Sequence, residues 1–405
     1  MVILFLIVFI GLVGFGIILP LFPFYAERFG ASPEVITWTM AAFTLAQAVG
    51  TPIWGRISDA YGRRMVLILT MFGSAMAYVM LAYADELWIV MLSRVFGGLM
   101  AGNISAAFAY VTDITTEENR SAGLGKVGAA MGLGFIFGPA IGGLLAGADV
   151  ETANFVAPAL ASAVVSLFAM VGTIIFLPES LDAKHRRPLF SARKSAGGES
   201  HGISLATFHR AALLKLLIAA MLFYTAMSQM ESIFPLWAND LFHKGPRDIG
   251  MVFFVLGIIS AAMQGGAIGP LTKRFGEKPV ALAAGVFFAT GLAILALARI
   301  EWQIWAGLVP FGIGVGLFNP TMSSMVSRTA SANERGAVMG QYQAASAMGR
   351  FFGPAMSGLI YSKISMAAPF GLAALIMVPV LILVGMFHLK QGDGPLNQAT
   401  GSEND

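Results

Sequence analysis

The stretch RSAGLGKVGAAMGLGFIFGPAIGGLL, Arg120–Leu145, returns later in the chain as RGAVMGQYQAASAMGRFFGPAMSGLI, Arg335–Ile360. Both copies contain a glycine–proline step, which the first copy places at Gly138-Pro139 and the second 215 residues later. Several further glycines and the leading arginine match at the same offset. A Gly-Pro helix that occurs twice in one chain predicts two homologous halves.

The composition of the chain indicates a helical membrane protein. Of its 405 residues, 57% are hydrophobic and 12% are charged, whereas about a quarter of the residues of a soluble domain are charged. The chain has no cysteine, which excludes a disulfide framework, a Cys-ligated metal site and a thiol nucleophile. The first apolar run continues into Pro20 and Phe24 without a small-residue cleavage site, so we interpret it as the first span.

Apolar runs long enough to cross a bilayer, which takes about 20 residues, occur twelve times. They lie at about 2–24, 35–54, 65–84, 87–110, 121–146, 153–177, 211–239, 248–271, 279–299, 302–326, 335–361 and 365–388. We therefore predict an all-α integral membrane protein. It consists of a six-helix bundle at 1–177, a cytoplasmic linker at 178–210, a second bundle at 211–390 and a disordered cytoplasmic tail at 391–405.

Lysine and arginine predict the orientation. Five of them fall on one side of the predicted membrane, at Arg28, Lys244, Arg247, Arg299 and Lys363, and 18 fall on the other. The positive-inside rule places the richer side, with both termini and the linker, in the cytoplasm. We expect the protein to be a monomer in a bacterial inner (cytoplasmic) membrane.

Two further repeats support the internal symmetry. GRISDAYGRR at Gly55–Arg64 returns as GPLTKRFGEK at Gly269–Lys278, and Pro20-Leu21 returns as Pro235-Leu236. Two parallel six-span repeats are typical of transporters that hold a substrate near the membrane midplane, between halves that rock about it.

Gly55–Arg64 resembles the G-x-x-x-D-R-x-G-R-R signature of the major facilitator superfamily, and it departs from that signature only at Ala60. The resemblance implies that Arg63 pairs with Asp113. We expect Asp59 to cap a neighbouring helix, such as the one that begins near Gly336. The alternative is an ordinary basic loop that follows the positive-inside rule. The gating residues predicted in this motif are Gly55, Asp59, Gly62, Arg63 and Arg64.

Two glycine patterns extend the resemblance. Arg94-x-x-x-Gly98-x-x-x-Gly102 resembles the span-four pattern of drug:proton antiporters, although close helix packing alone explains such glycines. The first Gly-Pro copy resembles the antiporter signature of the superfamily, whose helix is thought to close the cytoplasmic leak path; in the second copy Ser357 replaces an expected glycine. The gating residues predicted in the two copies are Arg120, Gly134, Gly138, Pro139, Gly142, Gly143, Gly353 and Pro354.

Together with IILP at Ile17–Pro20 and VTDITTEENR at Val111–Arg120, these motifs look most like the twelve-span drug:proton antiporter branch, with tetracycline-efflux proteins as the nearest pattern. The resemblance covers nearly the whole chain. The acids associated with metal–tetracycline recognition are missing, because their places fall on Gly11 and around Ala77–Tyr78. The resemblance therefore does not extend to tetracycline itself.

Three ionisable residues lie well inside the predicted spans, namely Arg94, Glu231 and Arg350. Such residues are costly in a bilayer and usually functional. We predict that Glu231, the only carboxylate among them, carries the proton, with Arg94 and Asp113 as the other coupling residues. The alternative for Glu231 is a structural ion pair that fixes span seven. Asp113 is a rival proton carrier, but its place at a helix end favours a structural network.

Two arginines against one glutamate favour an anionic or zwitterionic substrate, because arginine binds carboxylates through two parallel hydrogen bonds. The alternative for Arg350 is pairing with Glu231 or with backbone carbonyls. Other side chains expected at the substrate, each of which packing alone also explains, are Phe15, Gln47, Tyr78, Asn103, Tyr224, Gln229, Gln264, Asn319, Gln341 and Tyr342.

The predicted function is proton-coupled export of an amphipathic organic molecule by alternating access. One alternative is proton-coupled or facilitative uptake of a carboxylate metabolite, and another is a transport-inactive receptor or lipid-handling protein on the same fold. No enzyme signature is present, and the absence of a Walker motif argues against ATP-driven transport. The five histidines lack metal-ligand spacing, so we expect no metal and no cofactor. The partners we expect are the substrate, protons and the bilayer, but no nucleic acid.

Overall fold

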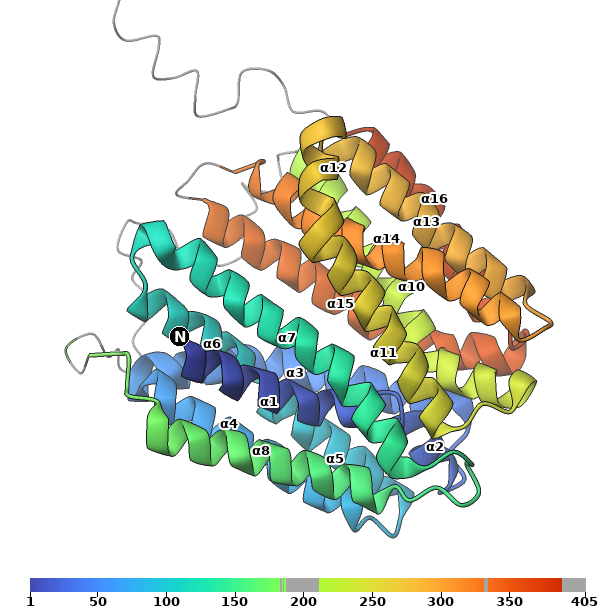
Figure 1. Ribbon diagram of the computed structural model, residues 1–405, viewed down its shortest axis with the longest axis horizontal. Coiled ribbons are helices and arrows are strands. Elements are labelled where there is room, and N and C mark those ends of the chain that lie inside the picture. Colours follow the sequence, from blue (N-terminus) through green and yellow to red (C-terminus); the bar gives the residue numbers. More distant parts are fainter. Residues whose placement is uncertain (183, 185, 187–210, 331–333, 388–405) are drawn as a thin grey trace, which may run out of the picture. The chain divides into compact units, whose positions relative to one another are not determined.

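The computed structural model describes residues 1–182, 184, 186, 211–330 and 334–387, and these form helices joined by short connections (Figure 1). The elements are α1 (Val2–Ile18), α2 (Phe22–Glu27), α3 (Pro33–Tyr61), α4 (Arg63–Ala82), α5 (Leu87–Met100), α6 (Asn103–Ile114), α7 (Glu117–Ala146), α8 (Val156–Phe176), α10 (Ala211–Phe242), α11 (Pro246–Ala262), η2 (Met263–Ala267), α12 (Ile268–Phe275), α13 (Glu277–Leu297), α14 (Trp302–Ser327), α15 (Arg335–Lys363) and α16 (Ala368–Gly385). Most of the predicted linker and all of the predicted tail lie outside the described residues.

Within the described part of the chain, each predicted span corresponds to one helix or to a consecutive set of helices. Nine of these segments are long and apolar enough to cross a membrane by themselves. The first, fourth and eighth spans are interrupted: α1 is followed by α2, α5 by α6, and α11 continues through the π-helical turn η2 into α12. The all-helical, twelve-span prediction is confirmed.

The chain forms two compact units. Unit one comprises Met1–Ala192, Glu231–Ile258 and Pro354–Met366, and unit two comprises Arg193–Met230, Ile259–Gly353 and Ala367–Asp405. Unit one thus contains the first half of the chain together with the C-terminal parts of α10 and α15 and most of α11. The boundaries predicted for the two bundles remain a prediction.

In unit one, the first Gly-Pro helix α7 lies beside α1 (Figure 1). The two helices pack along a row of glycines. A β-carbon added to Gly138 would lie 2.6 Å from the Cα of Gly16, and one added to Gly142 would lie 2.2 Å from the Ile17 carbonyl oxygen. Only glycine allows two helix backbones to approach so closely. This contact explains why the motif needs its glycine spacing.

In unit two, the second Gly-Pro helix α15 packs on α10 in the same way. A β-carbon on Gly349 would lie 2.3 Å from the Met221 carbonyl oxygen, and one on Gly353 would lie 2.5 Å from the Thr225 carbonyl oxygen. Because α1 and α10 occupy matching places in the two sequence repeats, the repeat read from the sequence is also a repeat in packing.

The break in the fourth span has a local cause. The helix α5 ends at Met100, and Ala101 follows it. The next residue, Gly102, lies against the Trp54 side chain: a β-carbon added to Gly102 would lie 2.5 Å from the Cβ of Trp54. The Trp54 indole N–H donates to the Leu99 carbonyl oxygen at 2.7 Å. This bond satisfies a carbonyl that the break removes from the regular helical pattern.

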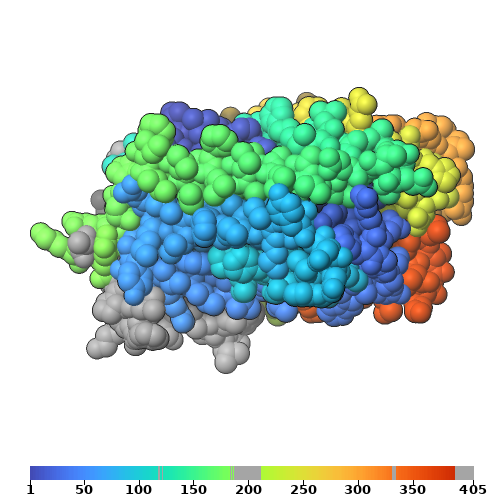
Figure 2. Space-filling view, turned by 90° about the horizontal axis from the view of Figure 1, so that it is seen from below, coloured from blue at the N-terminus to red at the C-terminus, as the bar shows by residue number. Residues whose placement is uncertain are grey.

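Helices α4, α5 and α8 lie next to one another on the face of the protein seen in Figure 2. Large apolar side chains are exposed on each of them. Phe72 on α4, Leu92 on α5 and Phe168 on α8 have exposed fractions of 48%, 46% and 67%. Large exposed apolar side chains on neighbouring helices are expected where a protein faces lipid. The surface therefore agrees with the membrane location predicted from the composition.

Candidate functional site

The loop between α3 and α4 holds a charge network in unit one. Gly62 turns the chain with φ 111°, and Arg63 then donates to Asp59 at 2.5 Å and to Asp113 at 3.0 Å. The expected Arg63–Asp113 pair is confirmed. The Asp59 carboxylate is bonded to Arg63, and the cap expected from it at the helix that begins near Gly336 stays a prediction. The N-terminus of α4, which follows directly, is capped by another residue.

That residue is Glu179, which the sequence analysis missed. Its carboxylate accepts hydrogen bonds from the backbone N–H groups of Arg63 at 2.8 Å and Arg64 at 3.2 Å. A carboxylate is favourable at a helix N-terminus, where the backbone donors are unpaired and the helix dipole is positive. The only signal in the sequence was an acid directly after Pro178 at the end of the sixth span.

Arg94 on α5 is buried, with an exposed fraction of 5%. Its guanidinium carbon lies 5.6 Å from the centre of the Phe22 ring and 5.8 Å from that of Tyr78. Neighbouring Tyr25 uses its hydroxyl to donate to the Leu81 carbonyl oxygen at 2.5 Å. The aromatic surroundings of Arg94 were not predicted, because α2, α4 and α5 each supply one or more of the groups.

Arg350 on α15 lies in unit two over the Tyr224 ring, with its guanidinium carbon 4.8 Å from the ring centre. Tyr224 is in turn hydrogen-bonded to the buried Tyr342. Beside this group, Phe223 stacks on Phe318 at a centroid distance of 4.1 Å. The structure thus brings together three of the predicted substrate residues, Arg350, Tyr224 and Tyr342.

The remaining predicted substrate residues divide between the units. Gln341 and Asn319, in unit two, each have a buried side-chain oxygen without a hydrogen-bond partner in the described structure. The Gln229 amide donates to the Pro369 carbonyl oxygen at 2.8 Å, so part of its polar capacity serves packing. Gln264 lies in η2. Unit one contains the other members of the set, namely Phe15, Gln47, Tyr78 and Asn103.

Glu231 lies at the first position of unit one on α10, where its side chain is partly buried. The next residue, Ser232, shares a 3.0 Å hydrogen bond with Ser357 of α15. Ser357, which replaced an expected glycine in the second motif copy, therefore has a structural role in joining these helices.

One end of unit one is closed by contacts between early and late segments of the chain. Ser362 on α15 donates to the Glu34 carboxylate on α3. The Tyr361 hydroxyl donates to Asp240 of α10 at 2.5 Å. A β-carbon on Gly250 would lie 2.4 Å from the Pro139 carbonyl oxygen, which places α11 directly on α7.

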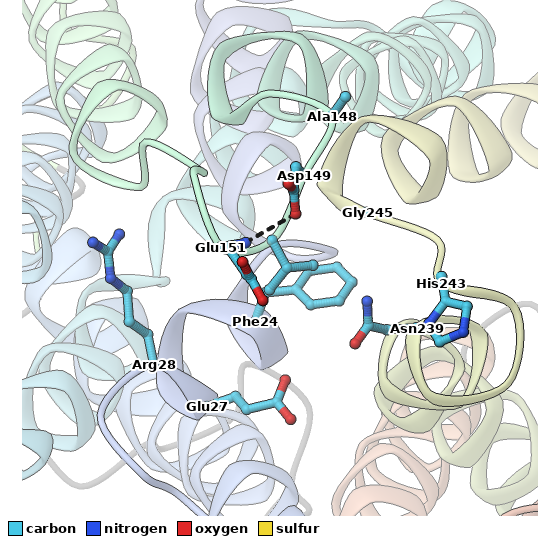
Figure 3. Close-up of a pocket in the computed structure, with 10 residues that line it drawn as sticks. Phe24, Glu27, Arg28, Ala148, Asp149, Glu151, Asn239, His243 and Gly245 are labelled. Atoms are coloured by element: carbon cyan, nitrogen blue, oxygen red, sulfur yellow. Dashed lines mark hydrogen bonds between the residues drawn. The ribbon is translucent and has the colours of Figure 1, made fainter.

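A cavity of about 610 Å³ opens near this end (Figure 3). Its lining mixes charge and apolar surface and includes Phe24, Glu27, Arg28, Asp149, Glu151, Asn239 and His243. Partial removal from water, and secondly the nearby Asp240, raise the pKa of Glu27 above its usual value. None of the substrate residues predicted from the sequence lines this cavity.

Comparison with known proteins gives consistent matches over nearly the whole chain. The family described as Major Facilitator Superfamily matches residues 4–268 and 242–403. Multidrug resistance protein 2 of Bacillus subtilis (strain 168) is 28% identical over 95% of this chain and 94% of its own length. Tetracycline resistance protein, class C, of Escherichia coli is 28% identical over 94% of this chain and 93% of its own length.

Solved structures show the same fold. The crystal structure of the human organic anion transporter MFSD10 (TETRAN) matches with a TM-score of 0.71 and 22% identity, over 95% of this chain and 98% of the other. The crystal structure of a mutant of the nucleoside transporter NupG matches with a TM-score of 0.76 and 14% identity, over 95% of this chain and 98% of the other.

Proposed function

Since the chain belongs to the major facilitator superfamily, we propose that it is a proton-coupled antiporter that exports an amphipathic organic anion or zwitterion. Relatives named as multidrug and tetracycline resistance proteins support export. As a superfamily member, it is an integral membrane transporter of small molecules and not an enzyme. We further propose a bacterial inner membrane, cytoplasmic termini and a monomeric state, as the distribution of lysine and arginine and the even number of spans suggest.

The observation that carries the substrate proposal is the position of Arg350 over Tyr224. Within unit two, the described residues include no carboxylate paired with Arg350. A guanidinium held against an aromatic face keeps its planar fork of N–H donors available for a carboxylate. The oxygens of Gln341 and Asn319, which lack partners in the described structure, would accept hydrogen bonds from N–H or O–H groups of the same substrate.

Glu231 is the proposed proton carrier. A carboxyl group in a membrane span takes up a proton more readily than in water, because burial disfavours its charged form, and a cation that approaches it reverses the effect. Alternating access would change these surroundings in each transport cycle. Arg94 and Asp113 remain proposed coupling residues, and Asp113 acts through its bond to Arg63.

Transport into inside-out vesicles under an imposed proton gradient tests both parts. Glu231→Gln should abolish proton-driven uptake and leave substrate binding measurable. Arg350→Ala should weaken transport and binding of organic anions about 10- to 100-fold, since a charged hydrogen bond contributes about 1.5–3 kcal/mol, and should affect organic cations little. Arg350→Lys, which keeps the charge but loses the fork, serves as the matched control. Undiminished proton coupling in Glu231→Gln, or equal losses for anions and cations in Arg350→Ala, would reject the corresponding assignment.

The direction of flux decides between export and the alternative of carboxylate uptake. Under an inward proton gradient, a symporter would carry the carboxylate into the vesicle together with the protons. An antiporter would expel the carboxylate from the vesicle. A transport-inactive receptor would bind the anion and show no proton-dependent flux in either direction.

A further inference from the structure

The described residues of unit one leave the charge of Arg94 unbalanced. Its side chain has an exposed fraction of only 5%. None of the ion pairs formed by the described residues of this unit involves Arg94, and its Nε atom has no hydrogen-bond partner. The groups that face it are the rings of Phe22 and Tyr78 and, within electrostatic reach, the Tyr25 hydroxyl.

Aromatic rings compensate a buried cation only in part. A cation over a ring gains attraction from the ring's electrons, but the ring does not accept the N–H hydrogen bonds that a guanidinium makes with water. A buried charge is normally stabilised by a counter-charge together with hydrogen bonds to its remaining donors. The described surroundings of Arg94 supply no counter-charge for its guanidinium and no hydrogen-bond acceptor for its Nε.

A second donor lies within electrostatic reach of Arg94. Tyr78 is buried, with an exposed fraction of 7%, and it interacts electrostatically with Arg94. Its hydroxyl makes no hydrogen bond with the described residues, whereas the Tyr25 hydroxyl donates a hydrogen bond to the Leu81 carbonyl oxygen. Arg94 therefore presents its N–H donors over the Tyr78 ring and close to the apolar Phe22 ring, and the Tyr78 hydroxyl is a further donor within electrostatic reach of its charge.

We propose that Arg94 and the Tyr78 hydroxyl bind the carboxylate of an organic acid with an apolar, preferably aromatic, body. The planar guanidinium matches the two oxygens of a carboxylate, the phenol supplies a further donor, and the rings of Phe22 and Tyr78 offer apolar surface to the rest of the molecule. This site belongs to unit one, whereas the Arg350 group belongs to unit two. The proposal requires neither proton coupling nor a direction of transport.

Equilibrium binding of radiolabelled benzoate to the purified, detergent-solubilised protein tests the site. Arg350→Met serves as the background, because it removes the candidate anion site of unit two. In this background, we expect one benzoate to bind per chain. Adding Tyr78→Phe should weaken binding about tenfold or more, and adding Arg94→Met should weaken it about 10- to 100-fold. Benzyl alcohol, which has the ring and no charge, should not compete.

A purely structural role for Arg94, in which it ties α2, α4 and α5 together through its aromatic neighbours, predicts a different result. Tyr78→Phe keeps the ring and would then leave benzoate binding unchanged. Absence of benzoate binding in Arg350→Met, or equal affinity after Tyr78→Phe, overturns the proposal. If Arg94→Met does not fold, the Tyr78→Phe comparison alone decides.

A competition experiment separates organic from inorganic anions. We expect chloride to displace benzoate only weakly, because a spherical ion cannot use the paired geometry of the guanidinium. Equal competition by chloride would assign the site to inorganic anions and overturn the carboxylate assignment. Because binding is measured at fixed pH and without a gradient, failure of the Glu231→Gln transport experiment would not affect this result.

Discussion

Gly143 lies directly against Pro246: a β-carbon on this glycine would come within 2.7 Å of the Pro246 carbonyl oxygen. The second copy repeats the contact, since a β-carbon on Gly358 would come within 2.4 Å of the Pro33 carbonyl oxygen. Pro246 begins α11 and Pro33 begins α3. In both repeats, therefore, the last glycine of the Gly-Pro helix meets the first residue of another helix, and these paired contacts close one end of unit one.

Gly143→Ala should open this end. A methyl group cannot fit at the observed distance from a backbone oxygen without a shift of α7 or α11, and overpacking of this kind costs about 1–3 kcal/mol. We expect a cysteine at the buried Thr37, which lies at the symmetry-related contact with Gly358, to react about tenfold or more faster with a thiol reagent. The chain has no cysteine, so Thr37→Cys alone provides the label.

Gly128→Ala is the matched control for Gly143→Ala. It lies on the same helix, and no atom lies within 4 Å of the position of its added β-carbon. It should leave the labelling rate unchanged and stabilise the helix by up to about 1 kcal/mol, because alanine favours helix more than glycine does. Equal labelling of the Gly143→Ala and Gly128→Ala proteins would contradict the role assigned to the contact.

A reversible cross-link should lock the closed end. The side chains of Glu34 and Ser362 are in direct contact, so Glu34→Cys combined with Ser362→Cys should form a disulfide under mild oxidation. If transport requires this end to open, oxidation should stop flux, and a reductant should restore it. Each single variant treated with the same oxidant is the control, and full transport by the cross-linked protein would show that the contact does not open during the cycle.

Removal of the Glu179 cap should destabilise the protein. Glu179→Ala leaves the N–H groups of Arg63 and Arg64 without their carboxylate, and loss of a cap costs about 0.5–2 kcal/mol. We expect a lower midpoint temperature of thermal unfolding in detergent for Glu179→Ala. The midpoint should fall less for Glu179→Gln, which retains one oxygen acceptor. The exposed Asp182→Ala should behave as wild type. An unchanged midpoint for Glu179→Ala would mean that water replaces the cap without cost.

The sequence was sufficient to predict features that follow a regular period or a fixed offset. Apolar runs predicted the spans because a bilayer sets their length, and the offset of 215 predicted two homologous halves. The packing of α7 on α1, which recurs as α15 on α10, agrees with those halves. The Arg63–Asp113 pair followed from a motif whose members lie at helix ends.

Groups assembled from several helices could not be predicted. Arg94 was recognised as an intramembrane charge, but its neighbours Phe22 and Tyr78 come from other helices and match no motif. The contact of Tyr361 with Asp240 likewise joins residues 121 positions apart. Such contacts depend on the rotation of each helix about its axis, which the apolar pattern of a membrane span barely constrains because lipid-facing and buried sides are both apolar.

Acidification should favour the closed end through Glu27, which lies at the end of α2 beyond the predicted first span. In the closed arrangement, partial removal from water and the nearby Asp240 raise the pKa of Glu27 above its ordinary value of 4.5. A raised carboxyl pKa means that the closed form binds the proton more tightly. Closure therefore strengthens as the pH falls through the raised pKa, and the gain is complete near pH 4.5.

Other charged groups at this end set the limits of the experiment. Arg28, Asp240, Tyr361 and Lys363 flank the Glu27–Glu34 region, and His243 lies on the same cavity. The hydrogen bond from Ser362 lowers the pKa of Glu34 to about 2. Its contribution to closure is complete above the ordinary value of 4.5 and is lost only as the pH falls towards 2. Above about pH 5, a change of closure with pH therefore reports on Glu27, whose pKa is raised, and not on Glu34.

The measurement is the labelling rate of Thr37→Cys in the purified protein as a function of pH, with and without Glu27→Gln. Each rate is divided by that of a cysteine at the exposed Asp182, which makes none of the contacts described for the closed end, and this corrects for ionisation of the thiol. In the Glu27-containing protein, the corrected rate should fall as the pH is lowered towards about 5. The neutral Glu27→Gln side chain should give the slow rate at every pH, because the closed end no longer has to accommodate a charge. If both proteins show the same pH dependence, another group, with His243 the first to test, controls closure.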